Sequence, residues 1–145
     1  MFNKETQYAL RSLVYIKVQN TKGRRPGIVE IAREIEAPQF FTAKILQRLV
    51  RAGFVESLKG KNGGFFFDPE KPDVKLEILI SAIEGNRSFS SCGFGLKNCS
   101  DGNPCPLHEK YAPIRRKVQK LVSEESIQSL ARKVQKKELN LKRMP

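Results

Sequence analysis

Apolar residues at helical spacing mark two helices near the start of the chain. Residues 4–19 contain no glycine or proline, and a broad apolar stripe makes them typical of a helix packed in a core: Ala9, Leu10, Leu13, Val14 and Ile16. The segment TKGRRPG at 21–27 breaks this pattern. Residues 28–35 predict a short amphipathic helix, with apolar side chains at i, i+3, i+4 and i+7: Ile28, Ile31, Ala32 and Ile35.

A third helix is predicted from Pro38 to about Arg51. Pro38 suits a first helical turn, and Gly53 provides a C-terminal stop. We expect the buried side to consist of Phe41, Ile45, Leu46, Leu49 and Val50. The outer face then presents Gln39, Phe40, Ala43, Lys44, Gln47 and Arg51. Two short helices joined by a tight turn, the second with a largely polar and basic outer face, predict a helix-turn-helix.

The next segment predicts a β-hairpin. Residues 54–58 alternate as a strand does, residues 65–68 are the return strand, and KGKNGG at 59–64 supplies the glycines that a tight turn needs. A hairpin directly after the second helix of the pair is a wing, and its tip carries Lys59, Lys61 and Asn62. Further helices are predicted at 74–84, 106–122 and 125–138, with a loop at 86–105.

These elements predict a mainly α fold with a small β-hairpin wing. We expect a winged helix-turn-helix domain at 1–85, a cysteine-rich loop at 86–105, and a long dimerisation helix with a C-terminal helix at 106–145. No stretch approaches the roughly 20 apolar residues of a membrane span. No signal peptide is recognisable at the start, and three clustered cysteines favour a reducing compartment, so we expect a cytoplasmic protein without a membrane partner.

The net charge of the chain indicates the class of partner that it binds. The chain has 27 lysines and arginines against 15 acidic residues, a net charge of +12. Residues 1–60 carry +6, residues 61–105 carry −1 and residues 106–145 carry +7. Such a balance predicts an anionic partner, of which nucleic acid is the first candidate. An ordinary small domain with a basic solvated face is the alternative, but the basic glycine-rich wing favours DNA.

The three cysteines form one group with the only histidine. Cys92, Cys99 and Cys105 are followed by His108, which comes three residues after Cys105. Three thiols and an imidazole are a ligand set for zinc or an iron–sulfur cluster, and the spacing lacks the paired C-x2-C of zinc fingers. Unrelated surface thiols are the alternative, which their clustering argues against.

The helix at 106–122 carries a narrow apolar seam among basic residues: Tyr111, Ile114, Val118 and Leu121. The seam can pack within its own domain, and the more specific hypothesis is that it forms a homodimer interface. We find no G-x-S-x-G, no phosphate loop and no paired carboxylates beside a histidine. We therefore do not expect an enzyme.

Together these segments resemble a bacterial family of winged helix-turn-helix repressors, which includes the iron–sulfur cluster assembly regulator IscR, the nitric-oxide-sensitive repressor NsrR and the cluster-free cysteine metabolism repressor CymR. The resemblance covers roughly residues 1–125 and is carried by YALRSLVYI at 8–16, IVEIAREI at 28–35, PQFFTAKILQRLVRAGFVES at 38–57, KGKNGGFFF at 59–67, AIEG at 82–85 and CPLHEKYAPIR at 105–115.

The resemblance implies a homodimer on a palindromic operator, with helix 39–51 in the major groove and the wing tip 59–62 in the minor groove. It implies a cluster on Cys92, Cys99 and Cys105, and His108 occupies the place of the fourth ligand of a 2Fe-2S site. In the 4Fe-4S type a carboxylate of the other subunit can be a ligand. Gln7 stands in that place, with Glu5 two residues away, so 2Fe-2S is favoured over 4Fe-4S.

Two alternatives remain open. The chain can be a cluster-free repressor controlled by its thiols or by a partner protein. From another class, it can be a basic zinc-binding protein associated with RNA. The leading hypothesis is a transcriptional repressor that senses iron–sulfur status, oxidant or nitric oxide.

Overall fold

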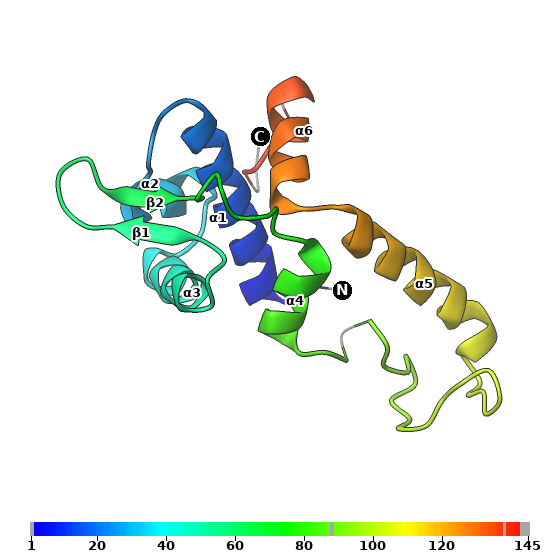
Figure 1. The fold of residues 1–145 in the computed structure, drawn as a ribbon. Coiled ribbons are helices and arrows are strands. Elements are labelled where there is room, and N and C mark those ends of the chain that lie inside the picture. The colour runs from blue at the N-terminus through cyan, green and yellow to red at the C-terminus, as the bar shows by residue number, and fades with distance from the viewer. Residues whose placement is uncertain (1, 88, 138, 143–145) are drawn as a thin grey trace. The chain divides into compact units, whose positions relative to one another are not determined.

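Helix α1 (Lys4–Thr21) is central to one of two compact units in the computed structural model, which describes residues 2–87, 89–137 and 139–142. The side chain of Asn3 caps this helix by accepting a hydrogen bond of 2.8 Å from the backbone N–H of Thr6. Ala9, Leu13 and Ile16 are fully buried. The helix packs against α2, α3, α6 and strand β2, so it holds the whole unit together (Figure 1).

The helix-turn-helix consists of α2 (Ile28–Glu34) and α3 (Gln39–Arg51). On α3 the buried side chains are Thr42, Ile45, Leu46 and Leu49. The expectation that Phe41 is buried is wrong, because its side chain is 56% exposed. Thr42 takes the place in the core, where its hydroxyl donates a 2.9 Å hydrogen bond to the Pro38 carbonyl and so removes the cost of burying it.

The predicted wing is formed by β1 (Glu56–Leu58) and β2 (Gly64–Phe66), which pair antiparallel with Leu58 opposite Gly64. Gly64 has a φ of +132°, and a Cβ at this position would collide with the backbone of Arg25. Only glycine therefore lets the segment before α2 approach β2, where the N–H of Phe65 donates to the Pro26 carbonyl at 2.9 Å. This contact fastens the hairpin to the helical part of the unit.

Helix α6 (Ile127–Lys137) returns to α1. Its start is capped reciprocally: the N–H of Ser129 donates to the hydroxyl of Ser126, and the N–H of Ser126 donates to the hydroxyl of Ser129. Ile127 is fully buried, and near the other end the Gln135 amide donates to the Thr21 hydroxyl at 2.5 Å. Residues from 126 onward thus belong to the same unit as residues up to 74.

The second unit comprises residues 75–125, with α4 (Leu76–Glu84) and α5 (His108–Glu124) in contact. Gly85 ends α4 with a φ of +95°. The buried apolar side chains of this unit are Leu76, Leu79, Ile80, Phe89, Ala112 and Val122. Between the two helices lies the segment with the three cysteines, residues 86–105, called the cysteine loop below.

The mainly α fold with a hairpin wing is as predicted. The compact units nevertheless cut across the predicted ranges 1–85, 86–105 and 106–145, because α4 groups with the cysteine loop and α5, while α6 groups with the helix-turn-helix. Burial of α6 against α1 is a long-range contact that local periodicity does not encode. No helix in the described part of the chain is long and apolar enough to cross a membrane.

Candidate functional site

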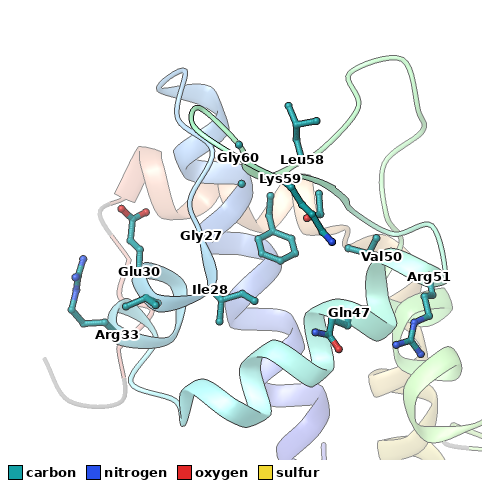
Figure 2. A pocket seen from close by; sticks show the side chains of 15 residues that line it. Gly27, Ile28, Glu30, Arg33, Gln47, Val50, Arg51, Leu58, Lys59 and Gly60 are labelled. Atoms are coloured by element: carbon teal, nitrogen blue, oxygen red, sulfur yellow. The ribbon is translucent and has the colours of Figure 1, made fainter.

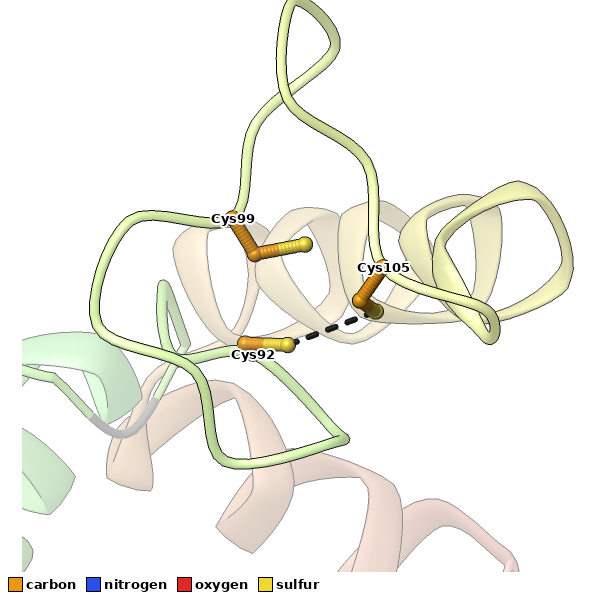
Figure 3. Close-up of side chains that lie close together, drawn as sticks. All are labelled: Cys92, Cys99 and Cys105. Carbon is orange, nitrogen blue, oxygen red and sulfur yellow. Dashed lines mark hydrogen bonds between the residues drawn. The ribbon is translucent and has the colours of Figure 1, made fainter.

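The cysteine loop brings its three thiols together. The Sγ atoms of Cys92, Cys99 and Cys105 all lie within 4.8 Å of one another, and those of Cys92 and Cys105 are 3.5 Å apart (Figure 3). Cys105 is buried and the other two are half-buried. Three soft sulfur donors that converge on one point at the protein surface fit a thiolate-bound metal centre.

The environment of the thiols differs from one to the next. Burial raises the pKa of Cys92, but hydrogen bonds from the backbone N–H groups of Leu96 and Phe94, together with side-chain hydrogen bonding to Cys105 and Cys99, lower the pKa to about 7. Burial raises the pKa of Cys99. Cys92 is therefore more readily deprotonated than Cys99, and the thiolate is the form that binds metals.

His108 lies beside this group. Its Nδ1 atom is 3.2 Å from the Sγ of Cys99, and its Nε2 atom is 2.8 Å from a carboxylate oxygen of Asp101. The hydrogen bond with His108 lowers the pKa of Asp101. A carboxylate that accepts from Nε2–H leaves Nδ1 with a lone pair on the side of the sulfurs, which is the arrangement of a histidine ligand with its supporting partner.

Two contacts join the cysteine loop to α5. The guanidinium of Arg115 donates a 3.1 Å hydrogen bond to the Ser91 carbonyl. Gly93 lies against the ring of Tyr111, so close that an added Cβ would be 2.9 Å from the ring atoms. The loop therefore follows the first turns of α5, and only glycine allows the approach to Tyr111.

The predicted seam of α5 is open to solvent. Ile114 and Leu121 are 53% and 52% exposed, Tyr111 is 38% exposed and Val118 is half-buried. The side of the helix that is buried within the unit is a different one and carries Ala112 and Val122. The seam is thus not needed for the core of the second unit.

On α3 the predicted outer face is largely exposed. Gln39, Lys44, Gln47 and Arg51 are exposed, Phe40 is 65% exposed, and Ala43 is half-buried. The ammonium of Lys44 lies 4.5 Å from the centre of the Phe40 ring, which explains how an aromatic side chain is tolerated there. This face combines hydrogen-bonding side chains with an apolar ring.

The hairpin and the helix-turn-helix enclose an open groove of about 860 Å³. Gln47 and Arg51 from α3 and Lys59 from the hairpin lie around it (Figure 2). At the tip Lys59, Lys61 and Asn62 are exposed, and Asn62 adopts a φ of +69° that completes the turn. Arg51, from the predicted outer face, and Lys59, from the predicted wing tip, therefore line one groove, although they are in different elements.

Sequence reasoning does not identify Asp101 as the partner of His108, because no periodicity marks a position in an irregular loop. Glu5, considered as a possible metal ligand, forms an ion pair of 2.5 Å with Arg48 of α3. The amide of Gln7 donates to the Phe2 carbonyl at 2.9 Å.

Comparisons with known proteins agree with this architecture. The family model of the iron-dependent transcriptional regulators, Rrf2, matches residues 2–133. A chain of Aquifex aeolicus named as an HTH-type transcriptional regulator is 27% identical over 90% of each chain. The HTH-type transcriptional repressor NsrR of Streptomyces coelicolor is 30% identical over 72% of this chain and 66% of its own.

Solved structures show the same fold. The global cysteine regulator CymR of B. subtilis aligns with a TM-score of 0.69 and 20% identity over 90% of this chain and 95% of its own. T. potens IscR aligns with a TM-score of 0.70 and 14% identity over 96% and 91%. The predicted family is confirmed, and the chain belongs to the Rrf2 family of iron-dependent transcriptional regulators.

Proposed function

We propose that this protein is a sequence-specific DNA-binding repressor that binds a palindromic operator as a homodimer, under the control of an iron–sulfur cluster in the cysteine loop. The convergence of the three Sγ atoms within 4.8 Å carries the proposal. Its second support is the exposed polar and basic face that α3 and the wing present.

Cys92, Cys99 and Cys105 would hold the cluster, and His108 would provide a fourth ligand through Nδ1. A cluster supplies a centre that reacts with oxidants and nitric oxide. Asp101 would hold the imidazole in the required orientation through its 2.8 Å hydrogen bond. A histidine beside the thiols, and the neutral amide of Gln7, favour 2Fe-2S over 4Fe-4S.

Contacts between the cysteine loop and α5 can couple the cluster to the dimer interface. Arg115 and Tyr111 hold the cysteine loop, and Tyr111 also belongs to the exposed seam. A partner helix packed on that seam sets the spacing of two copies of α3, which must match half-sites one helical turn apart. Order in the loop then favours one dimer geometry over another, which is a coupling free energy between the two sites.

On DNA, one set of side chains would contact bases and another would contact phosphates or the minor groove. Gln39, Lys44 and Gln47 reach base edges in the major groove, while Phe40 and Ala43 add apolar contact. A second set neutralises phosphates or enters the minor groove: Arg51, Lys59, Lys61 and Asn62.

Purification without oxygen, followed by iron and sulfide counting and an absorbance spectrum, tests the proposal. We expect about two iron ions and two sulfides per chain, with visible absorbance. Stoichiometric zinc without iron would contradict the cluster and support a structural zinc site instead.

The distance of 3.5 Å between the sulfurs of Cys92 and Cys105 also supports a second candidate, in which the same loop acts as a cluster-free thiol switch. An anaerobic preparation without iron or zinc, whose DNA affinity changes when the thiols are oxidised and recovers on reduction, would favour this candidate.

A further inference from the structure

The outer face of α6 is strongly basic and has no role in the function proposed above. Ile127, Gln128 and Ala131 are buried on the other side of this helix. No acidic residue occurs between Ile127 and Lys137. The exposed side carries four cations: Arg132, Lys133, Lys136 and Lys137.

Helix stability does not explain this face. Arg132 and Lys136, like Lys133 and Lys137, are spaced i, i+4, where like charges destabilise a helix. The helix dipole favours cations only in the last turn, so it accounts for Lys136 and Lys137 but not for Arg132 and Lys133.

Intramolecular ion pairs do not explain it either. Within the described part of the chain, Arg132, Lys136 and Lys137 form no ion pair. Cations elsewhere in the same unit do find partners, as Arg24 does with Glu30 and Lys142 with Glu34 at 3.8 Å. The positive charges of Arg132, Lys136 and Lys137 are therefore available to an anion from outside.

The face is separate from the recognition helix. In Figure 1, α1 lies between α3 and α6, and it packs against both. The hydrogen bond from Gln135 to Thr21 places the last turn of α6 beside the end of α1, where exposed Lys22 follows. A duplex held in its major groove by α3 does not explain cations on the far side of α1.

We propose that α6 binds the phosphate backbone of a second segment of duplex DNA. Arg132 to Lys137 span about 7.5 Å of helix axis. Over that length a duplex carries about four phosphate charges, which is enough to pair with Arg132, Lys136 and Lys137. An acidic protein is disfavoured as the partner because α6 offers none of the exposed aromatic or aliphatic anchors that protein interfaces use.

The test removes three charges from α6 in full-length protein whose recognition helix has been disabled. The background variant combines Gln39→Ala, Lys44→Ala, Gln47→Ala and Arg51→Ala. The α6 variant adds Arg132→Gln, Lys136→Gln and Lys137→Gln. A matched control adds Lys75→Gln, Lys110→Gln and Lys117→Gln, which remove the same charge from exposed positions in the other unit.

Each protein is titrated into a fluorescent random-sequence duplex of about two helical turns, and anisotropy is measured at several salt concentrations. We expect the background and control proteins to retain salt-dependent binding. In the α6 variant the slope of log K against log salt falls by roughly 2–3, because about 0.9 is lost per phosphate contact. Equal binding by the α6 variant and the control would overturn the proposal.

Two further arms identify the source of the second segment, both with α3 intact. If the segment is a separate duplex, protein on an immobilised duplex captures a labelled one, and the three α6 substitutions abolish capture. If it is a flank of the same DNA, wild type binds a long duplex more tightly than a short one, and the substitutions remove that gain. If the α6 substitutions remove neither the capture nor the gain in affinity with duplex length, the proposal is contradicted. Operator selectivity is measured in parallel and reports on α3 independently.

Discussion

Helix α3 and the cysteine loop are held in place in contrasting ways. Four buried side chains fix α3, and the polar residues of its outer face remain exposed. Among the described residues of the cysteine loop only Phe89 and Cys105 are buried, while Phe94 and Leu96 are 55% and 48% exposed. The recognition helix is thus positioned by a hydrophobic core, whereas the loop depends on hydrogen bonds and on whatever its thiols hold. Helix α3 can therefore keep its structure when the order of the cysteine loop changes.

A leucine-to-alanine substitution in each region should give the largest difference between them. Leu46→Ala removes a fully buried side chain and should lower the free energy of unfolding by about 2–5 kcal/mol. Leu96→Ala, in the loop, should change it by less than about 0.5 kcal/mol. Urea unfolding followed by circular dichroism measures both. Equal losses for the two variants would show that the loop has a core of its own.

The seam of α5 can be tested without disturbing either region. Ile114 is exposed, so Ile114→Asp should leave the fold intact and dissociate the dimer. Arg116→Asp, at an exposed position on the opposite side of the same helix, is the matched control. Sedimentation at micromolar concentration distinguishes the two states. A wild-type monomer, or a dimer that survives Ile114→Asp, contradicts the assignment of this seam.

Loss of a single thiol should remove the cluster and nothing else. Cys92→Ala, Cys99→Ala and Cys105→Ala should each abolish retention of iron and sulfide in anaerobically purified protein, with a secondary-structure spectrum like that of wild type. Ser100→Ala is the control within the loop. His108→Ala should weaken retention less, because a thiolate or water can take its place. A cysteine variant with full iron content removes that residue from the ligand set.

The smallest effect concerns the order in which the thiols react. In metal-free protein, alkylation of Cys92 by iodoacetamide should rise with pH around a midpoint of about 7, because only the thiolate reacts. The raised pKa of Cys99 should shift its reaction to a more alkaline range than that of an ordinary thiol. Peptide mapping by mass spectrometry at several pH values follows both. Identical profiles for the two residues would contradict the different environments described above.

The helices and the wing could be predicted because each has its own periodic or turn signal. The prediction for Phe41 is wrong because an apolar pattern does not indicate that Thr42 is buried. Thr42 can be buried because its hydroxyl forms a hydrogen bond within the helix. The return of α6 to α1 depends on contacts such as Gln135 with Thr21, which no local pattern encodes. For the candidate site, residue types alone identified the cysteines and His108. The role of Asp101 depends on loop geometry and had no signal in the sequence.

In the proposed function the cysteine centre controls sequence reading by α3. The most direct test is the ratio of operator to scrambled-duplex affinity, measured before and after iron is removed, with an operator selected from a random duplex pool. We expect the ratio to change by roughly tenfold or more, on the order of 1.4 kcal/mol of coupling. A variant with Gln39→Ala, Lys44→Ala and Gln47→Ala should lose about 1–3 kcal/mol on the operator per base-reading contact and little on scrambled DNA. A high ratio in wild type that is unaffected by iron removal would contradict the claim.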